Sequence, residues 1–435
     1  MKRTSLPIAA FVAAVLLIGL CLPVPAEDRV TIRFMHSLVN ATTPALNKML
    51  KDFEAENPGI HVVPEFVGDA LKEKLMTTVA AGEPPDVAWV HADYISELAK
   101  NDVIYPLDTF IKGKDGLTDA DLKDIPPGLI QMASDMDKKT KKYVLYSMPL
   151  ETTTLCIIYN KDLFKAAGMN PEKPPIDTWD QFGKAAKKLT DPAKKQWGFF
   201  IPCWGSGSLS GWFDWQFRPF IWAAGGKLIN DEGTKFLFNS PEGLKAFQFW
   251  YDLKYKYKGG TETPGDAGFN GGKVAMQIEG PWSIPVFQKL PFKWGAALLP
   301  KGPKYRRAPL GGEYLVIFKK SAHPEAAWKL IKFWTSTKRQ AQWAIDSGYL
   351  PMRTSVMKDP AYVEYCKKVP GLLTFVEELK YAYPSEGIPV NWSKCVDEIA
   401  ETMDRILKQK GVLKDLVDAA AAKCNQYLLE EEEEF

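Results

Sequence analysis

The spacing of apolar and polar residues predicts strands and helices in alternation along the first third of the chain. Residues 30–35 are β-rich, and Thr43-Pro44 is typical of a helix N-cap followed by a proline in the first turn. The apolar face of the helix that follows is formed by Leu46, Met49, Leu50 and Phe53. A second strand is expected at 60–67, and Pro64 favours an edge position or a bulge there because proline cannot donate a hydrogen bond to a neighbouring strand.

The same alternation continues after this strand. A polar helix is expected at 71–81, a turn at 82–85 and a buried strand at 86–90. A second alternating block follows residue 148, with a strand at 155–159, a short helix at 161–167, a helix opened by a capping box at Thr178 and Gln181, and another helix from Ser240. The last ~80 residues have mostly helical periodicity. Strand–helix alternation predicts parallel sheets that carry helices on both faces.

The first 26 residues have the layout of a secretory signal peptide. Two basic residues precede an uncharged, apolar run at 8–22, and Val24-Pro25-Ala26 supplies the small residues of a cleavage site. The run is shorter than the ~20 residues that a membrane-spanning helix needs. We therefore expect cleavage after Ala26 and export to the periplasm. Lipidation at Cys21 is the second alternative, because Leu20 stands where a lipoprotein signal has a small residue.

Charge and cysteine content exclude several classes of protein. Without the predicted signal peptide, the chain has 53 acidic residues and as many basic ones, so no basic excess attracts it to nucleic acid. The length predicts two or three domains. The five remaining cysteines are widely spaced and form no disulfide framework, although one bond among the last three would fit an oxidising compartment. His91 and Asp93 supply two metal ligands without a third, so we expect neither a metal nor a cofactor.

Tryptophan is the compositional feature that points most directly to a ligand. Trp204, Trp212, Trp215 and Trp222 crowd one stretch that is rich in glycine and serine. An indole offers a flat apolar surface to the C–H face of a sugar, whereas in ordinary proteins such residues also serve as core. Trp282 follows a Gly-Pro turn at the end of an apolar segment, where ligands bind in open α/β sheets. The residues alone leave both readings open, and Trp282 is the stronger ligand candidate.

Sequence motifs for catalysis are missing. Gly205-Ser206-Gly207-Ser208 lacks the G-x-S-x-G form of a nucleophile elbow, and the sequence contains neither a P-loop nor a G-x-G-x-x-G after a strand. We therefore expect a binding protein rather than an enzyme. A secreted glycoside hydrolase stays open as an alternative, because the separation of a carboxylate pair cannot be read from sequence.

Eight short segments, in order, resemble the sugar-type extracellular solute-binding proteins of ABC importers, the group that includes maltose-binding protein. The segments lie at 53–60, 82–87, 149–164, Thr178-Trp179, Glu279-Gly280-Pro281-Trp282, Gly311-Gly312, 323–328 and Gly348-Tyr349-Leu350-Pro351. Together they span essentially the whole chain after the predicted signal peptide. The order of the segments, more than any one of them, is what makes the resemblance specific.

The resemblance implies an α/β, two-lobe periplasmic-binding-protein fold of type II-like form, with crossover hinges and a ligand cleft between the lobes. The crossovers would fall near 147–154, 296–300 and 346–351. Lobe 1 would comprise 27–148 and 300–347, lobe 2 would comprise 149–299 and 348–429, and 430–435 would be an acidic tail. Such a protein captures a small ligand by closing its lobes.

The implied function is capture of a carbohydrate, an oligosaccharide or a related polyol, for delivery to the membrane permease of an ABC importer. The protein would act as a monomer, without nucleic acid. Ligands of the glycerol-phosphate type or acidic sugars are the alternative, because sequence does not settle the charge of the ligand.

Ligand contacts also follow from the resemblance. Lobe 1 would contribute His36, Ser37, His91, Asp93 and Tyr94; the first crossover would contribute Glu151 and Thr153; lobe 2 would contribute Asp214, Trp215, Trp282 and Trp392. Gly311 and Gly312 would offer backbone amides, with Tyr314 close behind. Trp204 is added on local composition alone. Arg353 would bind an anionic group of the ligand, or else form a structural salt bridge.

Overall fold

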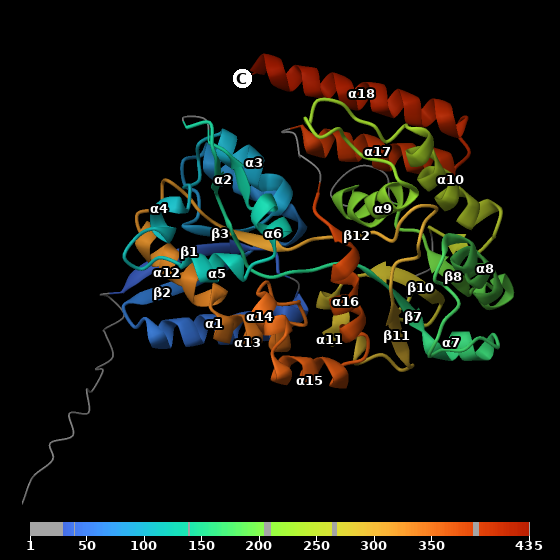
Figure 1. Ribbon diagram of the computed structural model, residues 1–435, viewed down its shortest axis with the longest axis horizontal. Helices are drawn as coiled ribbons and strands as arrows, with labels where there is room; N and C mark the ends of the chain where they lie inside the picture. The colour runs from blue at the N-terminus through green and yellow to red at the C-terminus, as the bar shows by residue number, and fades with distance from the viewer. Residues whose placement is uncertain are drawn as a thin grey trace, which may run out of the picture.

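Two lobes, each built on a five-stranded sheet, lie side by side in the computed structural model (Figure 1). The structure describes residues 29–38, 40–137, 140–203, 210–262, 268–385 and 391–434, so the predicted signal peptide lies outside the described residues. Each lobe is assembled from segments far apart in the sequence, because the chain passes from one sheet to the other and back. The α/β class and the two-lobe fold are confirmed.

The sheet of the first lobe is mixed, not parallel. Its order is β2-β1-β3-β13-β6. The strands are β1 (Val30–His36), β2 (Ile60–Phe66), β3 (Val87–His91), β6 (Met148–Pro149) and β13 (Glu313–Ile317). β1 runs parallel to both of its neighbours, whereas β13 is antiparallel to β3 and β6 because the chain enters it from the other lobe. β2 is an edge strand, as Pro64 predicted.

Helices cover both faces of this sheet, and Figure 1 shows α2 and α3 on one side with α1 and α13 on the other. The helices of this lobe are α1 (Thr43–Glu56), α2 (Leu71–Ala80), α3 (Ala92–Lys100), α4 (Asp108–Ile111), α5 (Asp119–Lys123), α6 (Pro127–Met132), α12 (Pro324–Thr335) and α13 (Thr337–Ser347). The predicted apolar face of α1 is buried. Its N-cap position is Thr42, one residue earlier than predicted, and no side chain caps it.

The sheet of the second lobe is buried on both faces. Its order is β11-β7-β10-β8-β9, with strands β7 (Cys156–Asn160), β8 (Trp197–Phe200), β9 (Gly260–Thr261), β10 (Val274–Glu279) and β11 (Trp294–Ala297). Along β7, Ile157 and Tyr159 enter one core while Cys156 and Ile158 enter another. Successive side chains of a strand point to opposite faces, so a strand covered on both sides is apolar throughout.

The helices of the second lobe begin largely where their capping residues predicted. They are α7 (Lys161–Ala166), α8 (Trp179–Leu189), α9 (Ser210–Ala224), α10 (Pro241–Tyr255), α11 (Ile284–Phe287), α14 (Thr354–Met357), α15 (Pro360–Lys368), α16 (Leu372–Glu378), α17 (Trp392–Leu407) and α18 (Leu413–Glu434). Thr178 and Gln181 form the predicted capping box of α8, and Ser240 caps α10. Helix α18 continues through the glutamate run to Glu434, where a separate tail was predicted.

Helix α9 corrects one prediction from composition. Trp212, Trp215 and Trp222 were assigned to a turn-rich segment, but they lie on this helix. Most of the glycines and serines precede it, and only Ser210 and Gly211 belong to its first turn. Phe213 and Phe217 recur at helical spacing and are fully buried. Trp204 lies outside the described residues.

Two small sheets complete the described structure. β4 (Ser134–Met136) and β5 (Tyr143–Leu145) form a hairpin, and β12 (Ala308–Pro309) pairs with β14 (Ala382–Tyr383). In the part of the chain that the structure describes, no helix is long and apolar enough to cross a membrane.

The three passages between the lobes are hydrogen-bonded to one another. Thr152 and Leu350 exchange backbone hydrogen bonds of 2.8 and 3.1 Å, and Thr153 and Gly311 exchange two of 2.9 Å. The first passage is therefore the middle strand of a short ladder between the lobes.

The second passage lies later in the chain than predicted. Lys301 pairs with Thr178, and Tyr305 donates its backbone N–H to Ala223, so this segment still belongs to the second lobe. The first contact with the crossover ladder is at Gly311. The boundary predicted at residue 300 is therefore too early, because residues 301–305 are still hydrogen-bonded to the second lobe at Thr178 and Ala223.

Candidate functional site

Four aromatic side chains meet where the lobes join, and we call Trp212, Trp215, Trp282 and Tyr349 the aromatic cluster. The ring centroid of Trp282 lies 5.6 Å from that of Trp212, 5.8 Å from Trp215 and 5.9 Å from Tyr349. Trp282 packs against the cores of both lobes. The three indoles remain partly exposed, so their faces are available to a flat apolar partner.

The turn before Trp282 explains how its ring reaches this place. Strand β10 ends at Glu279, and a short 3₁₀ turn, η5 (Pro281–Ser283), follows directly. A Cβ at Gly280 would collide with the six-membered ring of Trp282, so only glycine lets the indole fold back over the backbone. Gly-Pro-Trp is therefore a unit in which the glycine makes room for the tryptophan.

The first lobe presents the ends of two neighbouring strands at this junction. His36 ends β1 and His91 ends β3, and these strands are parallel, so both residues lie at the same edge of the sheet. Asp93 and Tyr94 follow in the first turn of α3. Ser37 donates its hydroxyl to the Gly68 carbonyl, so that hydroxyl holds the loop.

His36 is a neutral imidazole at physiological pH. The side chain is 5 % exposed, and burial lowers its pKa to about 4. Its Nδ1 has no hydrogen-bond partner among the described residues. A buried, uncharged ring of this kind can accept or donate one hydrogen bond without attracting a charged ligand.

Polar side chains of both lobes lie at the junction. Asp214 on α9 is buried, and burial raises its pKa, an effect that Arg218 opposes and that the nearby charge of Asp93 increases. Arg218 forms an ion pair with Asp214 and donates to the Ser385 hydroxyl at 2.7 Å. Lys72 of α2 also links the lobes, because its Nζ lies 3.5 Å from the Ser393 hydroxyl of α17.

Three further carboxyl groups surround Tyr349 at the crossovers. Glu151 is fully buried and accepts a hydrogen bond from the Trp343 indole; burial and the neighbouring Glu313 raise the pKa of Glu151 well above its usual range. Burial raises the pKa of Glu279 to about 7. Burial, followed by the charges of Glu313, Glu151 and Glu279, raises the pKa of Tyr349. One Glu151 carboxyl oxygen, Oε1, has no partner among the described residues.

Gly311 and Gly312 are required by the packing of the backbone, and the predicted role of their amides in ligand binding is not needed to explain them. The Gly311 N–H donates to Thr153 and its carbonyl accepts from Thr153, so the predicted ligand amide is already used. A Cβ at Gly312 would collide with the Glu151 carbonyl oxygen. Both glycines are thus explained by the close approach of two crossovers. The hydroxyl of Thr153 is buried without a partner in the described part of the chain, so it remains a candidate ligand group.

Two predicted ligand residues, Tyr314 and Arg353, lie elsewhere. Tyr314 is fully buried in the first core, and its hydroxyl donates to the Leu129 carbonyl at 3.4 Å. Arg353 is 2 % exposed and pairs with Asp121 and Asp124, both at 3.3 Å, which is the structural salt bridge left open by the sequence. Sequence could not reveal these partners because they come from a distant part of the chain.

Trp392 supports the site from behind. It is buried in the second core, stacks with Phe236 at 6.1 Å and lies 4.8 Å from the Arg218 guanidinium. Trp392 therefore contacts Arg218, which pairs with Asp214, where a contact with the ligand was predicted.

Sequence reasoning missed four residues of the junction. Glu279, Glu313, Tyr349 and Arg218 were not among the predicted ligand contacts. Glu279 and Tyr349 belong to segments of the resemblance, so their position beside Trp282 and at the third crossover was a usable signal. Glu313 and Arg218 carried no such signal, because an isolated charge in an apolar stretch does not show which way it points.

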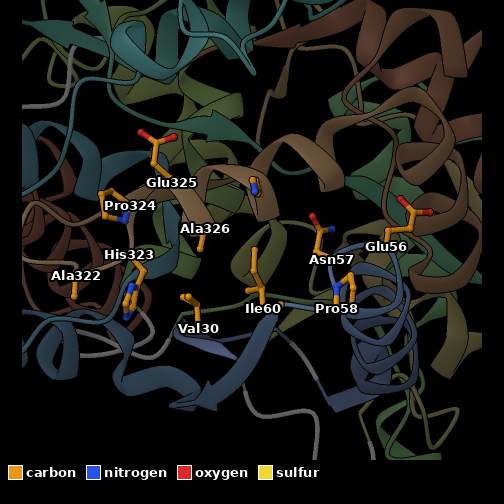
Figure 2. A pocket seen from close by; sticks show the side chains of 12 residues that line it. Val30, Glu56, Asn57, Pro58, Ile60, Ala322, His323, Pro324, Glu325 and Ala326 are labelled. Carbon is orange, nitrogen blue, oxygen red and sulfur yellow. The ribbon is translucent and has the colours of Figure 1, made fainter. Parts of the chain in front are cut away.

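A cavity of about 620 Å³ lies at the far end of the first lobe (Figure 2). It is lined by the starts of β1 and β2 at Val30 and Ile60, by the turn after α1 and by 322–326 at the start of α12. β1 begins at this cavity and ends at His36, so the cavity is separated from the lobe junction by the length of the strand. Among the described residues, no group of three or more His, Cys, Asp or Glu side chains could hold a metal ion.

Comparison with known proteins gives a family match over most of the chain. The sequence profile of the bacterial extracellular solute-binding proteins matches residues 40–341. A putative binding protein of Brucella abortus is 28 % identical over 400 residues, covering 89 % of this chain and 90 % of the relative. The maltotriose-binding protein of Pyrococcus abyssi is 26 % identical over 359 residues, 80 % of this chain and 71 % of the relative.

Two more matches differ in the ligand that they name. The sn-glycerol-3-phosphate-binding periplasmic protein UgpB of Escherichia coli is 25 % identical over 446 residues, 96 % of this chain and 97 % of the relative. Among solved structures, an ABC transporter solute-binding protein of Thermotoga lettingae bound with alpha-D-tagatose superposes with a TM-score of 0.79 and 29 % identity, covering 92 % of this chain and all of the other.

Proposed function

Because the chain belongs to the bacterial extracellular solute-binding protein family, we propose that it captures an uncharged, hydroxyl-rich sugar between its lobes for an ABC importer. The observation that carries the proposal is the aromatic cluster flanked by carboxyl groups of both lobes. Indoles stack on the apolar face of a sugar, and carboxylates accept its hydroxyls. Trp282 and Trp215 would stack on the sugar, while Asp93 and Thr153 would bind its hydroxyl groups.

Charge favours a neutral ligand over a phosphate. Two basic side chains at this junction are already paired: Arg218 with Asp214, and Lys72 with Glu97. Asp93 adds a carboxylate, and a phosphate would have to displace an existing ion pair to find a cation. A ligand of the glycerol-phosphate type is the second candidate, because the Escherichia coli relative is named for it.

The family relationship supports binding without turnover. The named relatives are binding proteins, and we infer that this chain releases its ligand unchanged to a membrane permease. We also propose that residues 1–26 direct export to the periplasm, where the protein acts as a monomer. Closure around the ligand would then distinguish the loaded from the empty protein, since a ligand shifts a two-state equilibrium only by its differential affinity.

A thermal-shift screen of residues 27–435 tests the ligand class. A ligand at a hundredfold excess over its Kd stabilises the folded state by about 2.7 kcal/mol, which corresponds to a Tm rise of roughly 3 °C for a chain of this length. We expect a saturable rise with maltose, maltotriose or D-tagatose and none with sn-glycerol 3-phosphate.

The opposite pattern, a rise with glycerol 3-phosphate and none with any sugar, would show that the ligand is anionic. Chromatography of the sugars after prolonged incubation provides the second readout. Unchanged oligosaccharides are expected, and release of shorter sugars would instead indicate a glycoside hydrolase.

A further inference from the structure

Helices α17 and α18 pack along each other on the outside of the second lobe (Figure 1). Cys395 of α17 and Cys424 of α18 face one another there, and both are fully buried. The Cys424 thiol donates to the Cys395 carbonyl at 3.7 Å, and the Cys395 thiol donates to the Cys424 carbonyl at 3.9 Å. This reciprocal contact brings each sulfur atom against the backbone of the other cysteine.

The neighbouring Cys395 thiol, together with burial, raises the pKa of Cys424, as expected for two side chains packed against each other. Other cysteines have different surroundings: the Cys156 thiol lies 3.8 Å from the Glu378 carboxyl, and Cys366 packs in another core of the lobe. Of the three C-terminal cysteines, the structure therefore brings together Cys395 and Cys424 and leaves Cys366 apart.

We infer that Cys395 and Cys424 form a disulfide bond in the exported protein. In thiol–disulfide exchange, the thiolate of one cysteine attacks an external disulfide, forms a mixed disulfide and releases one thiolate of the oxidant. The thiolate of the second cysteine then attacks the protein sulfur of the mixed disulfide and displaces the other thiolate of the oxidant. One S–S bond forms in the protein and one breaks in the oxidant, which leaves as two thiols carrying both protons. Oxidised dithiol catalysts and small disulfides of an oxidising compartment belong to this chemical class.

The bond would stabilise the wall behind the ligand site. The cysteines are 29 positions apart, and closing a loop of that length removes conformational freedom from the unfolded chain. Helix α17 begins with Trp392, which lies against Arg218, and Arg218 holds Asp214. The disulfide would therefore link α18 to α17, the helix that carries Trp392. This role does not depend on which ligand the protein binds.

Peptide mapping of the mature chain tests the bond. Protein purified from the periplasm without reductant is unfolded, alkylated with iodoacetamide and digested. We expect one linked peptide pair containing Cys395 and Cys424, which separates after treatment with dithiothreitol. Reduced protein refolded with oxidised glutathione should give the same pair, so the result does not depend on export.

Thermal unfolding supplies the second measurement. Protein refolded with reductant should melt roughly 5 °C or more below the oxidised protein. The Cys395→Ala/Cys424→Ala variant should melt at one temperature with or without reductant, whereas Cys366→Ala should keep both the linked peptides and the difference in Tm. Alkylation of both Cys395 and Cys424 in the unreduced protein, or a link from either to another cysteine, would overturn the inference.

Discussion

At the scale of single residues, Trp282 belongs both to the cores of the lobes and to the aromatic cluster. Its indole packs against both cores, and it also lies within 6 Å of three other aromatic rings. Neighbouring rings fix its orientation, so the face that remains exposed is presented in one direction. A side chain held in this way loses little conformational entropy when a ligand stacks on it.

Replacing this indole should weaken ligand binding more than folding. We expect Trp282→Ala to lower sugar affinity at least about tenfold, since an aromatic contact and its buried area exceed roughly 1.4 kcal/mol. Trp282→Phe, which keeps a ring, should lose less. Isothermal titration calorimetry measures the affinities, and the Tm of each variant without ligand checks the fold.

Trp179→Ala is the matched control for this experiment. Trp179 stacks on Phe249 at 4.5 Å in the second lobe and belongs to no part of the aromatic cluster. Its loss should change the Tm and leave sugar affinity as in the wild type. If Trp282→Ala bound sugar as tightly as Trp179→Ala, the aromatic cluster would not be the ligand site.

The sequence predicted which types of residue lie at the junction better than it predicted which residues they contact. The Gly-Pro turn identified Trp282, and Asp93 follows the end of a buried strand; the structure brings both to the junction. Arg353 and Tyr314 carried equally plausible chemistry, yet each is occupied by partners at 3.3–3.4 Å that come from distant parts of the chain. The local sequence shows which chemical groups a segment carries, whereas tertiary contacts decide whether those groups are free to bind a ligand.

At the scale of elements, capping residues and apolar periodicity predicted the helices correctly wherever the interactions that start a helix lie within a few residues of one another. The capping box of α8 and the Ser240 cap of α10 rest on hydrogen bonds within four residues. Helix α9 was missed because its first turn follows a run of glycine and serine, and its stability comes from burial of Phe213 and Phe217. The direction of β13 was missed for a similar reason, since it depends on the path of the chain through the other lobe.

Glu378 provides a pH test of one element contact. This fully buried residue of α16 accepts the Leu299 N–H at 3.0 Å and so fastens the helix to the chain after β11. Burial raises its pKa from 4.5 to about 8. Below pH 4.5 the carboxyl is protonated in both the folded and unfolded states; between 4.5 and 8 only the unfolded state ionises, so stability falls as pH rises.

Replacement of Glu378 with glutamine should remove this pH dependence. We expect Glu378→Gln to match the wild type near pH 4.5 and to be more stable near pH 8. The gain should be roughly 1–3 kcal/mol of the ~5 kcal/mol that the full shift represents, because relaxation and water reduce the penalty. Denaturant unfolding across this pH range measures the difference.

Glu377→Gln makes the same chemical change on the exposed side of α16 and keeps Glu378. Its stability should therefore still fall from pH 4.5 to 8, slightly less than in the wild type, because the charge of Glu377 makes a small contribution to the raised pKa of Glu378. A difference between Glu378→Gln and the wild type that stayed constant with pH would show that the residue acts through packing alone.

At the scale of the whole molecule, the crossover ladder determines how the lobes can move. Thr152 and Thr153 are hydrogen-bonded to the other two passages, so rotation between the lobes must occur within this narrow strip of backbone. Gly311 lies in the strip and directly under Trp215: a Cβ there would collide with the Trp215 ring and approach Thr153 Cγ2 to 2.9 Å. The hinge and the aromatic cluster therefore share one tightly packed position.

This packing leads to a prediction about closure. Small-angle scattering of the wild type should show a smaller radius of gyration with a bound sugar than without it, since closure brings the lobes together. In Gly311→Ala the added methyl collides with the Trp215 ring and crowds Thr153 of the first crossover, and overpacking of this kind costs about 1–3 kcal/mol. We therefore expect affinity to fall roughly five- to 150-fold and compaction to need correspondingly more sugar.

Gly211→Ala is the control for the added methyl, because a Cβ at that position of α9 has nothing within 4 Å. It should close at the same sugar concentration as the wild type. Identical scattering of the wild type with and without saturating sugar would exclude hinge closure. Equal behaviour of the two alanine variants would show instead that closure does not pass through the packing of Trp215 on Gly311.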